Sequence, residues 1–220
     1  MTDGPAQDLN LWKQHLGRVP DWVWSQDEAE TLVLADNDLT ELSPLVGRMQ
    51  KLRMLDLGHS RLTEVPEELG ALAGLRDFLY LHDNCLPSLP ASLARLTRLR
   101  YLNISGNAFH EFPECVCEMA GLIELRASDN QLSALPESLG RLSNLRELHL
   151  RNNQLTTLPD SSGTLRALRQ LDLRGNPLRA LPAALAELPL LEKLDLRWVT
   201  TLDPPSWLAA LEERGCAVYR

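Results

Sequence analysis

Leucines recur along the chain in a pattern of about 23 residues, with polar residues at fixed places between them. One unit, residues 145–159, reads LRELHLRNNQLTTLP, and the general frame is LxxLxLxxNxLxxLPxxLxxLxx. The alternation in LxL is typical of a short strand, whereas the later LxxL spacing favours a short helical turn. Each unit therefore predicts one strand followed by one helical turn.

An asparagine marks the same place in most units and fixes their register. This asparagine, or its replacement, stands at positions 14, 37, 60, 84, 107, 130, 153, 176 and 199. Each step is 23 residues except the one from 60 to 84, which is 24. The extra residue falls in Arg76–Phe78, where we expect a small bulge in the strand. Nine strand segments would then cover nearly the whole chain.

The repeat frame resembles the leucine-rich-repeat family over roughly residues 6–199. The 23-residue form with a Leu-Pro step is similar to that of cytosolic Ras-associated scaffold proteins and of bacterial members of the family. The resemblance implies an α/β fold, a right-handed solenoid bent into a horseshoe arc. It implies a parallel concave sheet of about nine strands and short helical or 3-10 turns on the convex side. It also implies that the asparagines tie neighbouring turns together as a ladder inside the core.

We expect one leucine-rich-repeat domain over residues 1–220. Residues 1–28 are expected to form a degenerate N-terminal capping repeat, and residues 29–190 the regular repeats. Residues 191–220 are expected to form a C-terminal strand, a capping helix and an edge strand. Stacked repeats need such caps, because the end units would otherwise expose leucines and an unpaired strand edge.

The sequence also suggests how the C-terminal cap is built. The helix is expected at Trp207–Arg214, with Ser206 as its N-cap and Gly215 as its stop. Cys216–Arg220 would follow as a short strand on the sheet edge. We expect Trp198 to pack under this cap, although a binding role for it remains open.

Two positions depart from the frame inside the array. Ser60 stands where most repeats have the ladder asparagine, so it should make a weaker link. Ser162 stands where Leu139 and Leu185 occupy the convex core position, so it should thin the core locally.

Function on a repeat scaffold lies in the strand residues that face outward. Aromatic side chains gather at the centre of the predicted concave face, and rings on a rigid sheet are typical of interface hot spots. The C-terminal third carries arginines beside aspartates. These charges are either a self-satisfied surface ladder or a charged rim that orients a partner. The candidate partner-binding residues are Met54, Tyr80, His82, Tyr101, Asn103, Arg126, His149, Arg151, Asp172, Arg174, Asp195 and Arg197.

The composition argues against several classes of function. The net charge is −8, and residues 1–74 hold 13 acidic against 6 basic side chains. This balance disfavours binding to nucleic acid or to an anionic membrane surface. No apolar run has the length of a transmembrane helix, and the start Met1–Pro5 lacks the features of a secretory signal. Four scattered cysteines without a Cys-rich cap favour a reducing cytoplasm.

Neither catalytic nor metal-binding residues are predicted. No glycine loop for phosphate and no distinct Ser–His–acid set occurs. Cys115 and Cys117 are too close for the usual zinc spacing, so we interpret them as structural residues on the convex side. His59 and His82 are expected to approach each other, but beyond Asp83 no third ligand is evident. We therefore assign no metal and no cofactor.

The capped array without an inserted domain favours a non-enzymatic, cytoplasmic, monomeric module that binds another protein on its concave face. The family resemblance implies a signalling or regulatory partner. One alternative is a substrate-recruiting effector similar to bacterial leucine-rich-repeat ubiquitin ligases, for which 220 residues leave no room unless the chain is a fragment. Another is recognition of a small ligand or glycan near Tyr80 and Tyr101, although open sheets lack deep pockets.

Overall fold

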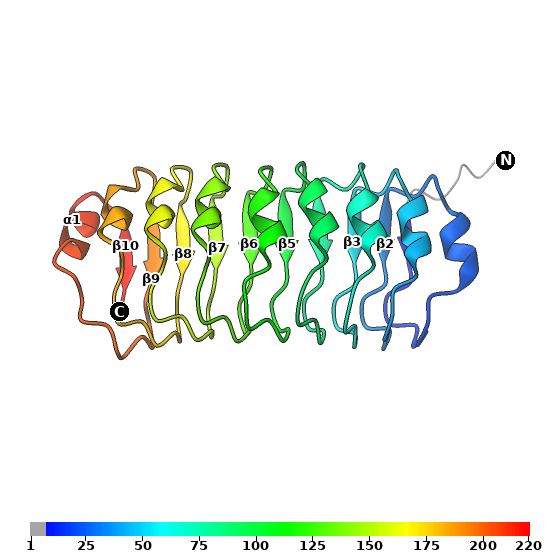
Figure 1. Cartoon of the computed structure of the whole chain (residues 1–220), viewed down its shortest axis with the longest axis horizontal. Coiled ribbons are helices and arrows are strands. Elements are labelled where there is room, and N and C mark those ends of the chain that lie inside the picture. The colour runs from blue at the N-terminus through cyan, green and yellow to red at the C-terminus, as the bar shows by residue number, and fades with distance from the viewer. Residues whose placement is uncertain (1–7) are drawn as a thin grey trace.

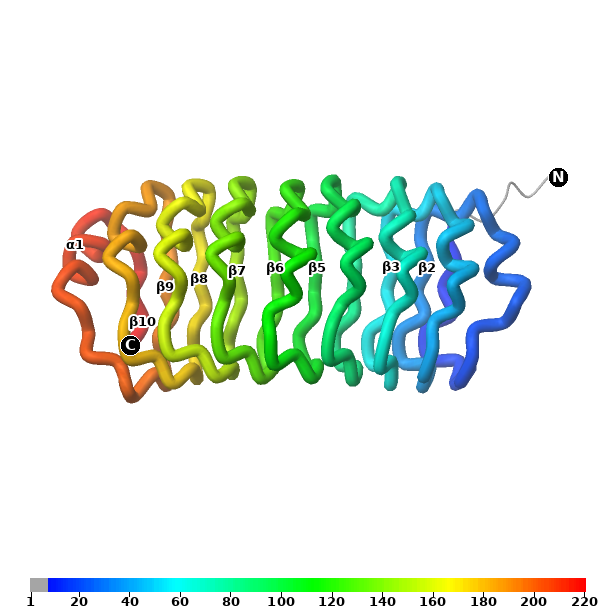
Figure 2. Tube along the Cα trace, in the orientation of Figure 1, coloured from blue at the N-terminus to red at the C-terminus, as the bar shows by residue number. Residues whose placement is uncertain are grey.

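The computed structural model describes residues 8–220 and shows a single parallel sheet along one face of an elongated arc (Figure 1). Ten strands in this range pair in chain order, each parallel to the next. Helical turns line the opposite face, and the tube of Figure 2 shows the chain winding once per repeat. The expected fold is confirmed, with the C-terminal edge strand as the tenth strand. The start Met1–Pro5 lies outside the described residues.

The elements alternate regularly from one end of the molecule to the other. The strands are β1 (Asp8–Asn10), β2 (Thr31–Val33), β3 (Met54–Asp56), β4 (Phe78–Tyr80), β5 (Tyr101–Asn103), β6 (Glu124–Arg126), β7 (Glu147–His149), β8 (Gln170–Asp172), β9 (Lys193–Asp195) and β10 (Ala217–Tyr219). The 3-10 helices are η1 (Asp21–Ser25), η2 (Pro44–Arg48), η3 (Glu67–Ala71), η4 (Ala91–Arg95), η5 (Glu114–Glu118), η6 (Glu137–Arg141), η7 (Asp160–Thr164) and η8 (Ala183–Glu187). The α-helix α1 (Leu208–Glu213) follows β9, and among residues 8–220 no helix is long and apolar enough to cross a bilayer.

The core is a stack of leucines contributed equally by the repeats. The middle residue of each strand points inward and lies in register with that of the next strand, as with Leu32, Leu55 and Leu79. These three side chains are fully buried. A single repeat cannot bury its own leucines, so each repeat depends on both neighbours for its stability.

The asparagine ladder of the family resemblance is present in the core. Asn84 donates from Nδ2 to the carbonyl oxygens of Leu57 (2.9 Å) and Leu81 (3.2 Å), and its Oδ1 accepts from the N–H of Leu62 (3.0 Å). One side chain thus serves backbone groups of two neighbouring repeats, which no purely apolar side chain could do. The same three-way arrangement recurs at Asn37, Asn107, Asn130, Asn153 and Asn176.

The residue directly before each ladder position has left-handed backbone geometry. This turn column consists of Lys13, Asp36, His59, Asp83, Gly106, Asp129, Asn152, Gly175 and Trp198, with φ between 50° and 67°. Such angles suit Gly, Asn and Asp and cost other residues roughly 1–2 kcal/mol. The turn keeps this shape even at the unfavourable residues Lys13, His59 and Trp198, which are the ones followed by Gln14, Ser60 and Val199 in place of the ladder asparagine.

The extra residue of the fourth repeat lies directly before β4, so the expected bulge within the strand is not observed. Phe78 pairs in register with Met54 on one side and with Tyr101 on the other, and the ladder of strands continues unbroken. The additional residue turns Asp77 toward Arg53, whose Nη2 lies 2.8 Å from the Asp77 carboxylate.

The C-terminal cap is formed as expected, with two corrections. β10 closes the sheet edge, since Leu196 N–H donates to the carbonyl oxygen of Tyr219 at 2.7 Å. Gly215 ends α1 with a φ of 91°. Ser206 does not cap the helix, because Trp207 takes the N-cap position without a side-chain hydrogen bond. Trp198 does not pack under the cap either: it is 66% exposed, whereas Trp207 packs against the core.

The two serines that depart from the repeat frame, Ser60 and Ser162, have buried hydroxyl groups without a hydrogen-bond partner among the described residues. The Oγ atoms of Ser60 and Ser162 make no hydrogen bond with any described residue. Ser162 is 2% exposed beside leucines that are fully buried at the same position of neighbouring repeats. In the other repeats an asparagine Oδ1 at this position accepts from a backbone N–H of the preceding repeat. Ser60 is too short to do so, and the N–H of the buried Leu39 is left without that acceptor.

We predict that Ser60→Asn stabilises the protein. The new side chain can accept from Leu39 N–H and donate to the carbonyl oxygens of Leu34 and Leu57, as its counterparts do. Satisfying a buried donor and adding such bonds should contribute about 1–2 kcal/mol. Urea unfolding should show a higher midpoint, whereas Ser88→Asn on the exposed surface should leave it unchanged. A lower midpoint for Ser60→Asn would contradict the assigned role of the ladder.

We also predict that deleting residues 204–220 causes aggregation. The deletion removes α1 and β10, exposing Leu194, Leu196 and the free edge of β9. Light scattering should show oligomers, and the melting temperature should fall. Tyr219→Ala, which keeps the strand and removes one exposed ring, should melt near wild type. A truncated chain with an unchanged melting curve would show that the cap is dispensable.

Candidate functional site

The centre of the concave face carries a cluster of aromatic rings, called here the aromatic patch: Phe78, Tyr80, His82 and Tyr101. Phe78 and Tyr80 of β4 lie beside Tyr101 of β5, because residues flanking the inward leucine point outward, and His82 follows β4 two residues later. The Tyr80 and Tyr101 ring centroids are 5.0 Å apart, and Phe78 lies 5.5 Å from Tyr101. The Phe78 ring also stacks on Tyr80 at 6.0 Å, with planes only 11° apart.

Phe78 is the residue of this patch that the sequence analysis missed. It is 43% exposed, which is unusual for a phenylalanine. Phe78 stands directly before the inward Leu79, as Met54 stands before Leu55. This match in the sequence could have identified Phe78 as an outward strand residue. The extra residue hid it, because Phe78 was assigned to a bulge instead of an outward strand position.

The remaining predicted residues of the centre frame the patch. Met54 is half-buried in β3 beside Phe78 in register. Asn103 ends β5 opposite Tyr80, and its Oδ1 accepts from Ser105 N–H at 3.1 Å. That hydrogen bond stabilises the turn after the strand, so the Asn103 side chain already has a local structural role.

Burial shapes the electrostatics of the tyrosines. Desolvation raises the pKa of Tyr101 to about 12, an effect that the nearby Arg126 guanidinium partly opposes. Desolvation, with help from Asp56, raises the pKa of Tyr80 as well. Both hydroxyls are therefore neutral near pH 7 and remain available to donate hydrogen bonds. The Arg126 guanidinium lies 6.0 Å from the Tyr101 ring centroid, within reach of a cation–π contact.

A hollow of about 440 Å³ opens beside the patch, toward the start of the strands. Phe78, Tyr101 and Ile123 form its apolar wall, while Arg53 and Glu124 supply charge at its rim. Arg53 is held in place by Glu30 at 3.0 Å and by Asp77. The hollow is open to solvent and continuous with the aromatic patch, so both can be covered by the same ligand.

Arg126 and His149 belong to a polar cluster next to the patch. Arg126 Nε donates to Glu124 Oε1 at 2.6 Å. His149 Nε2 lies 3.3 Å from Glu147 Oε2 and 3.8 Å from Glu124 Oε1. Arg126 offsets one of the two carboxylate charges of this cluster.

The charged C-terminal third is a network of ion pairs, as the first of the two interpretations proposed. Arg174 pairs with Asp172 through Nη2 at 2.6 Å, and Arg197 pairs with Asp195 in the same way at 2.7 Å. Arg151 pairs with Asp129 instead, at 2.9 Å.

The two aspartates of this third lie beneath their arginines. Asp195 is fully buried and Asp172 is 8% exposed, so a partner would meet the arginines first. Burial alone would raise the pKa of Asp195, but hydrogen bonds from Arg197 and the Arg174 charge outweigh it and lower that pKa. Asp195 therefore stays ionised and orients both guanidinium groups.

Trp198 adds an exposed ring to the end of the charged third. The guanidinium carbons of Arg174 and Arg197 each lie 5.8 Å from its ring centroid. Because its ring is exposed and flanked by cations, Trp198 extends the candidate surface. The position of Trp198 therefore favours a role in binding over a role in packing under the cap.

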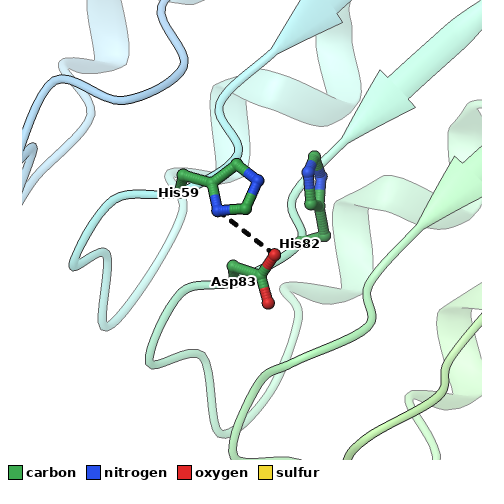
Figure 3. A group of neighbouring side chains, drawn as sticks. All are labelled: His59, His82 and Asp83. Atoms are coloured by element: carbon green, nitrogen blue, oxygen red, sulfur yellow. Dashed lines mark ion pairs between the residues drawn. The ribbon is translucent and has the colours of Figure 1, made fainter. Parts of the chain in front are cut away.

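The histidines and cysteines fall into different environments. His59 and His82 approach to 4.7 Å between ring centroids, beside Asp83 (Figure 3). Burial raises the pKa of Cys115 to about 11, and it raises the pKa of Cys117 too. Both thiols are buried on the convex side, in keeping with the structural role expected for them.

Comparisons with known proteins agree with this geometry. Leucine-rich-repeat family models match residues 98–119 and the overlapping stretches 120–178 and 143–198. No curated protein sequence matches the chain at a significant level.

Several solved structures share the fold. A leucine-rich-repeat protein of Leptospira interrogans superposes with a TM-score of 0.73 and 27% identity, over 88% of this chain and 55% of its own. A plant peptide hormone receptor, RGFR1, in complex with RGF2 gives 0.77 and 30%, over 87% of this chain and 32% of its own.

The ectodomain of the Arabidopsis thaliana receptor kinase GASSHO1/SCHENGEN3, in complex with CASPARIAN STRIP INTEGRITY FACTOR 2, gives a TM-score of 0.63 and 30% identity, over 81% of this chain and 25% of its own. The chain thus spans about half of the bacterial protein and a smaller share of the receptors. The repeat frame, the asparagine ladder and these matches together show that this chain is a leucine-rich-repeat protein.

Proposed function

We propose that this protein acts without catalysis, as a module that binds a segment of another protein on its concave face. The observation that carries the proposal is the aromatic patch, where Phe78, Tyr80 and Tyr101 present rings to solvent from a rigid parallel sheet. Such rings lose little conformational entropy on binding, and they bury a large area when covered.

The chemistry of the face suggests what the partner segment carries. An apolar or aromatic side chain would fit the hollow walled by Phe78, Tyr101 and Ile123. The neutral hydroxyls of Tyr80 and Tyr101 would then donate to carbonyl groups of the segment. Two of the similar receptor structures are complexes with RGF2 and with CASPARIAN STRIP INTEGRITY FACTOR 2, which makes a peptide-like partner a natural candidate.

The charged third would orient the partner more than hold it. Arg174 and Arg197 are fixed by buried carboxylates, so they present two cations at defined positions without losing further side-chain entropy. Rim charges of this kind change the rate of association and the choice of partner more than the affinity. An acidic group on the partner, placed beyond its apolar anchor, would match them.

We further propose that the protein works as a monomer in a reducing, cytoplasmic environment. Cys85, Cys115, Cys117 and Cys216 are all unpaired, which suits a compartment where thiols stay reduced.

The test is capture of partners from a native lysate with the full chain immobilised. Wild type is compared with Tyr80→Ala/Tyr101→Ala and with Trp22→Ala, which removes a ring that is 50% exposed on the convex side. We expect one protein to be retained by wild type and by Trp22→Ala and lost with the double variant. Measured with that purified partner, the double variant should bind at least about 30-fold more weakly, as for hot-spot residues.

Matching melting curves for the three proteins would show that the comparison is between folded chains. If the double variant captures the same proteins as wild type, the aromatic patch is not the binding site. If Trp22→Ala loses the partner instead, the binding surface lies on the convex side.

A further inference from the structure

A second site with different chemistry shares His82 with the aromatic patch and lies where His59, His82 and Asp83 converge (Figure 3). His59 Nδ1 is 3.2 Å from Asp83 Oδ2, and the two imidazole rings meet nearly edge to face, at 79°. One ligand atom from each of the three residues lies within 4.8 Å of the others.

The repeat architecture brings the three residues together. His59 and Asp83 occupy the same place in consecutive repeats, in the turn column, and both have left-handed backbones with φ of 50° and 52°. His82 precedes Asp83 and projects over Gly58. A Cβ at Gly58 would lie 2.4 Å from His82 Cε1, so glycine is what lets this ring lie against His59.

His82 has an unused ligand atom. Its Nδ1 is buried and makes no hydrogen bond with any residue of the described chain. A neutral imidazole nitrogen with no partner is costly in a folded protein unless it meets a donor or a metal ion.

The surroundings favour a cation. Asp83 pairs with His59, and within residues 8–220 no lysine or arginine neutralises it. Asp36 and Asp56 also lie near enough to act on His82. The other group of this type, Glu124, Glu147 and His149, differs because Arg126 already binds Glu124 at 2.6 Å.

We propose that His59, His82 and Asp83 bind a divalent transition-metal ion of the zinc class, with the remaining coordination positions open to solvent. Two imidazoles and one carboxylate are typical ligands of Zn²⁺, at roughly 2.0–2.2 Å from the metal. Ligand atoms around a tetrahedral ion lie roughly 3.3 Å apart, so a modest rotation of the exposed His59 side chain would complete the site. The proposal goes beyond the protein-binding role and does not depend on it.

The site is tested with the full chain, freed of metal by a chelator and titrated with Zn²⁺ and Co²⁺. Calorimetry should show one equivalent that His59→Ala removes, and bound Co²⁺ should give visible d–d absorption that is lost in the same variant. His59 is half-exposed, so its replacement should leave the fold intact, as a melting curve would verify. His149→Ala is the matched control, because it removes a histidine from the second group on the same face.

We expect the affinity for Zn²⁺ to fall at least about tenfold with His59→Ala and with Asp83→Asn, and to remain within about twofold with His149→Ala. Gly58→Ala, which displaces the His82 ring, should also weaken binding. Absence of a saturable equivalent in wild type would overturn the proposal. Equal binding by wild type and His59→Ala would overturn it as well, since the ion would then lie elsewhere.

Discussion

Asparagine side chains buried behind the strands hold neighbouring repeats together, and the arrangement of the whole arc depends on them. Each turn that leaves the sheet brings backbone N–H and C=O groups into the core, where unpaired groups cost free energy. A ladder asparagine such as Asn84 satisfies groups of two repeats at once. Leucine stacking drives the burial, and parallel strand pairing sets the spacing of the repeats, whereas the asparagine ladder satisfies the backbone groups of the turns. Ser60 marks the one internal repeat of the described chain where this link is replaced by a shorter side chain.

Fixed spacing turns the concave face into columns of side chains with defined neighbours. The aromatic patch forms because outward positions of β4 and β5 carry rings, and parallel pairing brings them within 5–6 Å. The turn column arises in the same way, with its left-handed residues stacked along one edge of the sheet. The His59–Asp83 pair is a product of that column. Both candidate surfaces therefore rest on the repeat geometry, although their chemistry differs.

The charged third shows how the same geometry handles polar groups. Asp195 is completely buried in a concave column, yet its charge is retained because Arg174 and Arg197, which follow β8 and β9, approach it from above. The arginine side chains remain partly exposed, so the contribution of these pairs to stability is modest. Their effect is to hold guanidinium groups in place, which leaves a defined positive surface next to the exposed ring of Trp198.

The sequence by itself determined the repeat length, the strand positions, the inward leucines and the outward columns, because all of these follow from periodicity. Periodicity also gave the positions of the asparagines, whereas their role as a ladder was implied by the family resemblance. It also located Tyr80 and Tyr101 correctly on the concave face. The tertiary structure decided matters that depend on contacts between repeats. It placed the extra residue before β4, which exposed Phe78, and it buried Asp195 beneath arginines and left Trp198 in solvent. Periodicity tells which way a side chain points, but burial and pairing depend on the size and charge of neighbours 23 or 24 residues away.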